Sequence, residues 1–498
     1  MGGNARATSA GQGPVGTPDR RHTGQGPLQR GTARWIRQGP AVAAAGLAGL
    51  VLIGSSAANP QEELPGPDLR LDFSSGILVS DNIEGLREPE GTSTLWQNSV
   101  ALSFDSVTRT ETFSARAGLM LQTGRYADQI EQRELEQNVL QDPFVTLSYG
   151  RDTRDAAVDF SASYRERDNG LEEVELLDSA SLVIDQGRRS DLALEAGLEI
   201  GRDAPIGFSA EAGYRERRFF DTTDPDLTDE NIARIEAGVS VRLSPTLQLT
   251  FSSSFAERDE DDVVDTVETN TANRLGLSFR GRGGLSGSAS IGYQVDETTR
   301  TVAGDRVTER EDEPVLSFSV AQARPDGEIT ASLAQRVVST GPRTDILLGR
   351  SLDLPRAELA ASLGVSVGDE GDSVSGIGQL SYVQPLPRGR LSASARQSVA
   401  TDDGDDELFT SASLGYSHDL TRLSSVALTL GLSAVESLED EGTDRQRVSA
   451  SISWSRQLTQ DWSFNMGYRH STQRETDEDP IIENAVFANF GRSFDIRP

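Results

Sequence analysis

Apolar and polar residues alternate along this chain, and no other feature restricts its fold as strongly. From Leu69 onward the alternation recurs in many segments, each about ten residues long. In residues 192–200, Leu, Ala and Ile occupy every second position, and Ala, Gly and Glu fill the positions between them. Residues 206–214 and 448–454 repeat the pattern. A period of two is the period of a β-strand with two different faces, so the sequence predicts an all-β protein.

The kind of β-protein follows from the polar positions and from the segment lengths. Soluble β-sandwiches also alternate, but their apolar face packs into a core and their polar face meets bulk water. Here the polar positions are mostly Ser, Gly, Thr and single charges, which suit a wet, narrow lumen. The segments are also long enough for a tilted strand to cross a bilayer. We therefore expect a transmembrane antiparallel up-and-down β-barrel over residues 67–498, in which closure removes the sheet edges.

Composition excludes several other classes of protein. No run of about 18 or more apolar residues follows residue 60, which argues against a helical membrane protein. The absence of cysteine excludes disulfides, thiolate metal sites and cysteine nucleophiles. The net charge is −31, with 78 acidic residues against 47 basic ones, all arginine. A chain this acidic has no general attraction for nucleic acid, so we expect no nucleic-acid partner.

The N-terminal region has the three parts of a secretory signal. A basic flank at residues 34–37 precedes the apolar run 41–54, and small residues follow at 55–58. We therefore predict an N-terminal extension and signal peptide over residues 1–58. A short periplasmic lead-in, residues 59–66, would connect it to the barrel. A single membrane anchor is the alternative, but the length and flanks of the apolar run fit it less well.

The connections between the predicted strands alternate in length and chemistry, and long ones are acidic. Outer-membrane barrels join their strands by short periplasmic turns and longer external loops. Counting on this basis gives about 22 strands, with roughly 18 to 24 as the range, and an even number leaves both ends in the periplasm. Residues 171–186 are assigned to an external loop and 344–353 to a strand. The long acidic connections are expected near residues 217–231, 257–269, 297–311, 368–372, 401–407, 437–446 and 471–483.

Tyrosine and tryptophan favour the two membrane interfaces, and here they fall near predicted strand ends. We predict two aromatic girdles, although chance placement at strand ends is an alternative. The outer girdle would comprise Tyr164, Tyr214, Tyr293, Tyr468 and Trp96, and the inner girdle Tyr149, Tyr382, Tyr416, Trp454 and Trp462.

Charged residues at polar strand positions are predicted to face the lumen. Opposed rows of acid and arginine inside a barrel can create a transverse field that selects solutes. They can equally form ion pairs that fill the interior and stiffen the wall, and the sequence leaves both interpretations open. The predicted lumen residues are Arg116, Asp159, Arg165, Glu195, Glu199, Glu211, Arg215, Arg234, Glu236, Arg242, Arg280, Arg336 and Arg396.

Signals for catalysis or metal binding are weak. His418 and His470 lie in predicted strands at opposite ends, so they cannot share a metal site. His470 lies near the acidic residues 475–479, the kind of place where barrel proteases and lipases keep a His and acid pair, but an exposed His beside solvated acid is far commoner. The acidic runs 402–407 and 259–262 lack the ordered spacing of an EF-hand. We expect no enzyme, no catalytic residue, no metal site and no cofactor.

The C-terminal segment carries a family resemblance. Residues 484–498 have alternate apolar residues and a near-terminal aromatic, Phe494, and resemble the last strand of proteobacterial outer-membrane barrels. The motif YRER, at Tyr164–Arg167 and Tyr214–Arg217, resembles the porin-2-like outer-membrane barrel families of unknown substrate. The resemblance implies an outer-membrane location in a Gram-negative bacterium. It also implies contact with membrane lipid, with lipopolysaccharide and with the barrel-assembly machinery, which would read Phe494. It carries over no catalytic or binding residue.

Three functions are compatible with such a barrel. The favoured expectation is a passive or weakly selective channel for small hydrophilic solutes. An export conduit or anchor for a surface polysaccharide is the second. A secreted adhesive β-rich protein with no membrane face is the third. No segment the size of a plug domain precedes the first predicted strand, so an energised receptor for iron complexes is not expected.

Overall fold

The computed structural model describes part of the chain after residue 66. The described part is residues 67–496 without 84, 90, 126–138, 169–172, 176–179, 183–186, 221, 223–226, 303–304, 339–340, 369–373, 403–404, 439–443 and 477. The predicted signal peptide and lead-in, residues 1–66, lie outside these residues. Where the chain is described, no helix has the length and apolar character of a membrane span.

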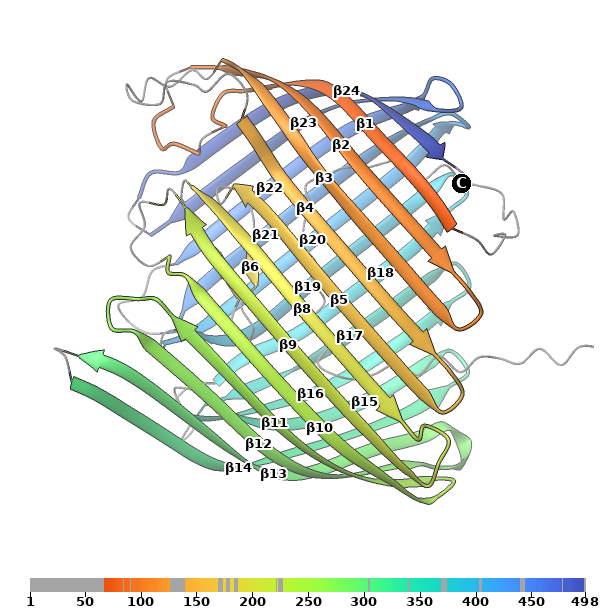
Figure 1. Ribbon diagram of the computed structural model, residues 1–498, viewed down its shortest axis with the longest axis vertical. Helices are drawn as coiled ribbons and strands as arrows, with labels where there is room; N and C mark the ends of the chain where they lie inside the picture. Colours follow the sequence, from red (N-terminus) through yellow and green to blue (C-terminus); the bar gives the residue numbers. More distant parts are fainter. Residues whose placement is uncertain are drawn as a thin grey trace, which may run out of the picture. The chain divides into compact units, whose positions relative to one another are not determined.

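Strands make up nearly all of the described chain (Figure 1). The first twelve are β1 (Pro67–Ser80), β2 (Ser93–Val107), β3 (Glu111–Arg125), β4 (Val139–Asp152), β5 (Ala156–Asp168), β6 (Glu173–Glu175), β7 (Ala180–Leu182), β8 (Arg188–Ile200), β9 (Ile206–Phe220), β10 (Glu230–Ser244), β11 (Leu247–Glu260) and β12 (Thr266–Arg280). After the 3-10 turn η2 (Arg282–Gly284) come β13 (Leu285–Val302), β14 (Asp305–Arg324), β15 (Gly327–Val338), β16 (Gly341–Leu354), β17 (Ala357–Val367), β18 (Val374–Leu386), β19 (Gly389–Asp402), β20 (Asp405–Thr421), β21 (Ser424–Ser437), β22 (Arg445–Gln457), β23 (Trp462–Glu475) and β24 (Ile481–Ile496).

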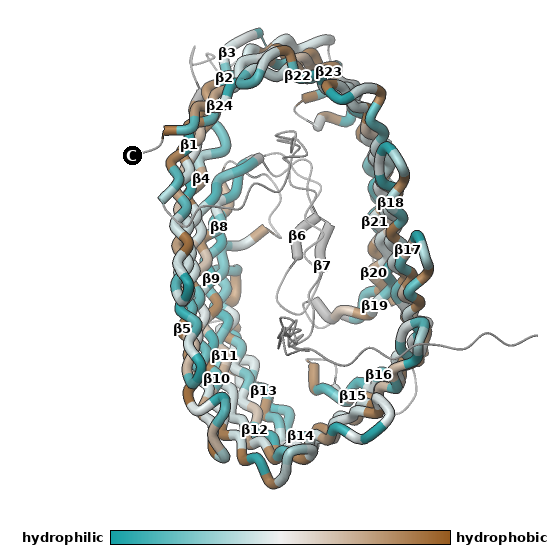
Figure 2. Tube along the Cα trace, turned by 90° about the vertical axis from the view of Figure 1, so that its right-hand side faces the viewer, coloured by the Kyte–Doolittle hydropathy of each residue, from teal (hydrophilic) through white to brown (hydrophobic). Residues whose placement is uncertain are grey.

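Twenty-two of these strands form one closed antiparallel sheet (Figure 2). Each pairs with its neighbours along the chain, and β1 pairs with β24 from Leu69 opposite Ile496 to Ser80 opposite Ala485. Closure gives every strand two hydrogen-bonded neighbours, which leaves no edge exposed to lipid. The prediction of a 22-stranded antiparallel barrel is confirmed. Of residues 171–186, which were predicted to form an external loop, the described parts are β6 and β7, and these pair with each other outside the wall. Residues 344–353 fall inside β16.

Contacts between non-adjacent strands identify the inner face of the wall. Arg343 of β16 forms an ion pair with Asp406 of β20, four strands away, and such a contact runs through the concave side of a closed sheet. Leu348 lies on the opposite face of β16 and is 67% exposed. It is paired with Leu363 of β17, another exposed aliphatic residue. The outer face is therefore apolar.

An apolar outer surface on a closed barrel requires lipid around it. Large exposed apolar side chains recur on strands throughout the wall, including Phe208, Ile235, Ile291 and Val486. So much exposed apolar surface is incompatible with a soluble monomer, whereas a closed barrel satisfies its backbone polar groups within a bilayer. The protein is thus an outer-membrane barrel, and an adhesive protein without a membrane face does not fit it.

The two ends of the barrel differ in the length of the connections between strands, although less than predicted. At one end, tight two-residue turns join β10 to β11, β14 to β15, β16 to β17, β18 to β19 and β20 to β21. At the other end, the predicted loop 297–311 is mostly strand, because β13 and β14 remain paired up to Val302 opposite Asp305. The predicted loops 257–269 and 401–407 likewise contain strand residues. Hydropathy marks where a strand leaves the membrane, but charged and β-branched residues continue the hydrogen-bonded ladder in water.

The turn between β14 and β15 illustrates the backbone demands of the tight end. Arg350 donates a hydrogen bond to Asp326 at 2.7 Å, and this bond holds the pKa of the Asp326 carboxyl below its ordinary value. The next residue, Gly327, has a φ of +133°, a conformation that side chains disfavour. A Cβ at this position would lie 2.1 Å from the carbonyl oxygen of Ser351. Glycine is therefore required here by both backbone angle and space.

Substitution of this glycine should measurably weaken the barrel. We expect Gly327→Ala to lower the free energy of unfolding by more than about 1 kcal/mol, since alanine must adopt a strained φ and displace the neighbouring strand. Gly376→Ala is the matched control, because no heavy atom lies within 4 Å of its added Cβ. Urea unfolding of both variants in lipid vesicles would measure the difference. Equal stability of the two variants would contradict this account of the turn.

Candidate functional site

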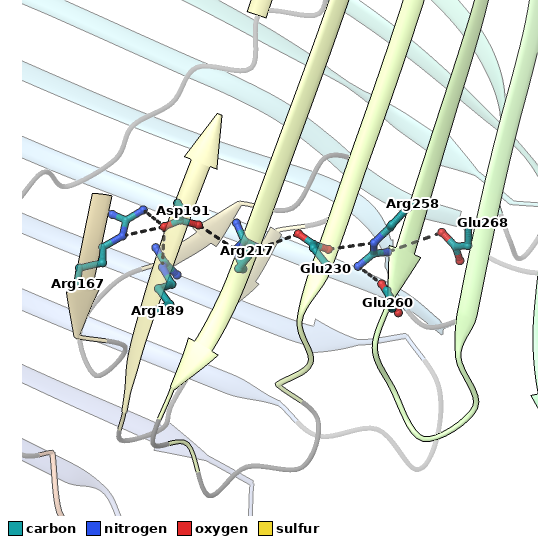
Figure 3. Close-up of polar contacts among 8 residues, drawn as sticks. All are labelled: Arg167, Arg189, Asp191, Arg217, Glu230, Arg258, Glu260 and Glu268. Carbon is teal, nitrogen blue, oxygen red and sulfur yellow. Dashed lines mark hydrogen bonds and ion pairs between the residues drawn. The ribbon is translucent and has the colours of Figure 1, made fainter. Parts of the chain in front are cut away.

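The inner face of β5 and β8–β12 carries a continuous row of ion pairs (Figure 3). We call it the inner charge row. The row lies near the end of the barrel opposite the two-residue turns, which we call the loop-rich end. Neighbouring members lie on adjacent strands and on one face, because the register sets them opposite or nearly opposite one another. Its members are Arg167, Arg189, Asp191, Arg217, Glu230, Arg258, Glu260 and Glu268.

Asp191 on β8 is the first centre of the row. Its carboxylate accepts charge-assisted contacts from Arg167 at 3.1 Å and from Arg189 at 3.2 Å. Arg217 on β9 contacts it at 3.1 Å and also reaches Glu230 on β10 at 3.1 Å. Arg217 thus joins two carboxylates on two other strands, a geometry that the guanidinium fork suits.

Glu230 and Arg258 continue the row across β10, β11 and β12. Arg258 lies 3.1 Å from Glu230, 2.5 Å from Glu260 and 3.7 Å from Glu268. Glu230 and Glu260 are buried, so their charges require these partners. With four arginines and four carboxylates, the inner charge row balances its own charge. This stretch therefore matches the wall-stiffening interpretation of the lumen charges.

Closer to the membrane centre, the same strands carry charges that are more open to the lumen. Arg234 contacts Glu195 at 3.2 Å, and Arg215 lies 3.9 Å from the same carboxylate. The three side chains are between 44% and 48% exposed. Their exposure would allow each of them to replace its present partner by a charged solute in the lumen. This is what the interpretation of the lumen charges as a solute-selecting field requires.

The predicted lumen residues occupy different heights of the inner wall. Glu195, Arg215 and Arg234 come together as described, whereas others have local partners. Arg116 lies over the ring of Phe144, with 5.5 Å to its centroid. Arg242 donates to the carbonyl oxygens of Arg202 and Asp203 in the turn before β9. The other placements are Asp159 opposite Gly197, Arg165 opposite Asp191, Glu199 beside Arg202, Glu211 opposite Glu236, Arg280 opposite Ser286, Arg336 opposite Arg343 and Arg396 opposite Ser411. A contact of these residues with a solute stays a prediction.

A second inner cluster includes the predicted lumen residue Arg336 and adds Arg343, which the sequence did not single out. Arg343 is 1% exposed and contacts the hydroxyl of Ser366 at 3.1 Å as well as Asp406. Arg336 donates to the carbonyl oxygen of Val399 on β19 at 2.9 Å. The loop-rich end of β19 and β20 therefore lies against the inner face of β15 and β16. Phe409 of β20 is buried, and so is Glu407, which was predicted to belong to the external loop 401–407.

The predicted girdle aromatics lie at several exposed positions of the wall. Trp96, Tyr293, Tyr416, Tyr468 and Trp462 are exposed, and Tyr149, Tyr164, Tyr214, Tyr382 and Trp454 are partly buried. Several phenol groups donate to polar partners, as Tyr214 does to Glu216 and Tyr382 does to Gln384. Phe494 lies in β24 opposite Leu71, with the Arg492 guanidinium 4.2 Å from its ring centroid. Its role as an assembly signal stays a prediction.

The two strand histidines contact neighbouring aromatic and polar side chains. His418 stacks on Tyr416 with 6.2 Å between ring centroids. His470 bonds to Asn484 and Thr472, while the acids predicted beside it, Glu475 and Glu478, pair with Arg87. Within the described ranges, no group of three or more His, Asp or Glu side chains is arranged to hold a metal ion.

These features define the class as a closed, 22-stranded outer-membrane β-barrel with a charged inner wall. Solved structures that it resembles include two metal transporters and a siderophore receptor. The FrpB iron transporter from Neisseria meningitidis superposes with a TM-score of 0.55 at 10% identity, over 86% of this chain and 82% of that one. The siderophore receptor PirA from Acinetobacter baumannii superposes with a TM-score of 0.51 at 8% identity, over 87% of this chain and 81% of that one. The copper transporter OprC superposes with a TM-score of 0.51 at 11% identity, over 87% of this chain and 81% of that one.

Likeness at such low identity shows a shared fold. No protein-family model matches the sequence, and no curated protein matches it either. The expected relationship to porin-2-like families is therefore not supported, whereas the large barrel architecture is. The structural neighbours include an iron transporter and a siderophore receptor, a group that the sequence did not lead us to expect.

Proposed function

We propose that this protein is a selective transport barrel of the outer membrane, which takes up small hydrophilic solutes that are positively charged or carry a metal ion. The single observation that supports this most is the difference between the two parts of the inner surface. The inner charge row balances its own charge, but the strand ends beyond it carry a large excess of exposed acid. We infer that a solute enters through a negative mouth and then passes the inner charge row, whose charges are paired.

The outer half of β14 is the best described part of that mouth. Residues 305–313 include five acids and two arginines, and nearly all of them are exposed. The connection between β11 and β12 adds the exposed residues Asp261 and Asp265. A charged mouth raises the local concentration of oppositely charged solutes and speeds their capture. Cations are therefore the solutes that this end of the barrel would collect.

The fold neighbours support selective transport over a weakly selective pore. They include transporters for iron and copper and a siderophore receptor, each similar to this chain over most of its length. Selectivity also suits an inner wall with Glu195, Arg215 and Arg234 accessible to a passing solute. A passive and weakly selective channel is therefore not our preferred function.

Ion selectivity in planar bilayers tests the proposal. In a KCl gradient, the wild-type barrel is expected to give a reversal potential of the sign that shows a preference for K⁺ over Cl⁻. The variant Asp305→Asn/Glu309→Gln/Glu311→Gln should lose a large part of that preference, because it removes three exposed charges from the mouth. The matched control is Asp353→Asn/Asp419→Asn/Asp461→Asn, which removes three exposed charges from the tight-turn end. A barrel that prefers anions, shows no preference or passes neither ion would contradict the proposal.

A further inference from the structure

An outward-facing set of hydrogen bonds near the loop-rich ends of β23 and β24 has the geometry of a nucleophile, a base and an orienting amide. The Thr472 hydroxyl lies 3.2 Å from Nε2 of His470. The other ring nitrogen of His470, Nδ1, lies 2.8 Å from Oδ1 of Asn484. His470 and Thr472 are two residues apart on one face of β23, and Asn484 is directly opposite His470 on β24. A hydroxyl, an imidazole and an amide connected in this order are the parts of a hydrolytic triad.

The donors and acceptors of this set fix the direction of each proton. Asp81 accepts a hydrogen bond from Nδ2 of Asn484 at 2.8 Å, and a carboxylate can only accept, so the other amide atom that faces His470 is the oxygen. That oxygen can also only accept, so Nδ1 of His470 carries a proton. Nε2 of the neutral ring is then an acceptor, and the Thr472 hydroxyl donates to it. This is the protonation state in which an imidazole can act as a general base towards the hydroxyl.

The orienting amide is itself held firmly by the segment after β1. The Asn484 backbone N–H donates to Asp81 at 2.7 Å, and the Asp81 backbone N–H donates back to the Asn484 carbonyl at 3.1 Å. Tyr468 donates its phenol proton to Oδ1 of Asn484 at 2.7 Å. The neighbouring Asn82, 2% exposed, ties this segment to the Ile482 carbonyl at 2.9 Å. Asp81 and Asn484 are therefore positioning residues for His470.

The surroundings of Thr472 indicate the kind of molecule that could reach it. Thr472 lies between two exposed aliphatic side chains, Val448 on β22 and Ile482 on β24. A groove of about 290 Å³ is lined by Thr472, Val448, Gln446 and the cationic Arg474. Apolar walls beside a guanidinium fit an amphiphile with an acyl chain and an anionic head group. Thr472 is also four residues along β23 from the exposed Tyr468, a residue type that favours membrane interfaces.

We propose that Thr472, His470 and Asn484 form an esterase site for acyl esters of membrane amphiphiles with an anionic head group. Nε2 of His470 takes the hydroxyl proton while Oγ1 of Thr472 forms a bond to the ester carbonyl carbon. The carbon–oxygen bond to the alcohol then breaks, and His470 returns the proton to the leaving alkoxide. A water molecule, deprotonated by His470, attacks the acyl-threonine. The bond from the acyl carbon to Oγ1 then breaks, His470 returns the proton to Oγ1 of Thr472, and the carboxylic acid is released. Arg474 and Gln446 supply hydrogen-bond donors beside the groove for the negative charge on the carbonyl oxygen.

Hydrolysis of a p-nitrophenyl acyl ester by the purified full chain in detergent micelles tests the chemistry. Thr472→Val and His470→Asn are each expected to lower the rate by at least about 100-fold, as the loss of a general base or nucleophile does. Thr472→Ser should retain activity. Thr271→Val and His418→Asn are matched controls on strands remote from the groove, and heat-dependent gel mobility verifies that each variant is folded. A wild-type rate no higher than that of Thr472→Val, in folded protein, would overturn the proposal.

Two further readouts separate a catalytic array from a structural one. Asp81→Asn should lower kcat with little change in KM and should alter the pH profile, because it releases the amide that orients His470.

Two lipid experiments then identify the source of the ester. One uses vesicles of phosphatidylethanolamine and phosphatidylglycerol, and the other uses purified lipid A. Release of fatty acid in one arm assigns that lipid, and release in neither arm would overturn the lipid substrate class. The outcome is independent of the bilayer selectivity measurement, since the groove lies on the outer face of the wall.

Discussion

Replacement of Arg343 by alanine is expected to lower the free energy of unfolding of the barrel by about 3–5 kcal/mol. The guanidinium of Arg343 is almost completely buried, and its partner Asp406 is 15% exposed. Removal of the arginine takes this buried cation away from a carboxylate in a poorly hydrated position. The Ser366 hydroxyl loses its contact as well, and the end of β19 and β20 loses an attachment to the inner wall.

Two further variants make this prediction specific to burial. Arg154→Ala removes an arginine that is 86% exposed and paired with Asp203, so it should cost below about 1 kcal/mol. The double variant Arg343→Met/Asp406→Leu should be more stable than Arg343→Ala, because it removes the poorly hydrated carboxylate together with the arginine. Urea titration of the barrel in vesicles, followed by heat-dependent gel mobility, would measure all three. An Arg343→Ala barrel as stable as Arg154→Ala would show that the buried pair contributes nothing.

The second large loss of stability should come from a charge placed on the outer face of the barrel. Leu348→Arg places a guanidinium on the outer face near the middle of β16, and we expect it to cost about 2–4 kcal/mol if this position lies near the bilayer midplane. Leu347→Arg is the matched control. It makes the same change one residue away on the inner face, opposite Gly364 and Ser332, where water can solvate the new charge. Its cost should be clearly smaller.

Equilibrium unfolding in lipid vesicles would compare these two variants with the wild type. A greater loss of stability for Leu347→Arg than for Leu348→Arg would mean that the two faces of the wall are assigned the wrong way round. The membrane orientation and the assignment of the lumen would then fail together.

Much of the architecture could be predicted because strand periodicity is a local property. Alternation at residues 192–200 and 448–454 identifies strands and separates their two faces without knowledge of the partner strand. The extent of the strands was harder to predict. At residues 297–311 the acidic composition suggested a loop, but β13 and β14 remain paired up to Val302 opposite Asp305. Backbone hydrogen bonds form equally well with polar side chains, so composition alone does not end a strand.

The candidate sites were less predictable than the wall. Glu195, Arg215 and Arg234 could be assigned to one face from alternation, and the structure adds that they are close enough to interact. The inner charge row includes Asp191, Arg217 and Glu230, which alternation also allowed, but no rule of spacing singled them out. The contacts of Arg343 with Asp406 depend on how β19 and β20 lie against β16, and no local signal encodes that.

The sequence by itself determined that this protein is a closed, lipid-embedded barrel of about 22 strands, because a period of two and the length of each repeat are written within single segments. Only the tertiary structure decided which charges meet. Register aligns His470 with Asn484, and chain closure through β1 brings Asp81 to the same amide from 403 residues away. The physical reason is that hydrogen bonds and ion pairs depend on distances of a few ångströms between strands. A shift of one residue in pairing would preserve the pattern within each strand and separate every one of these partners.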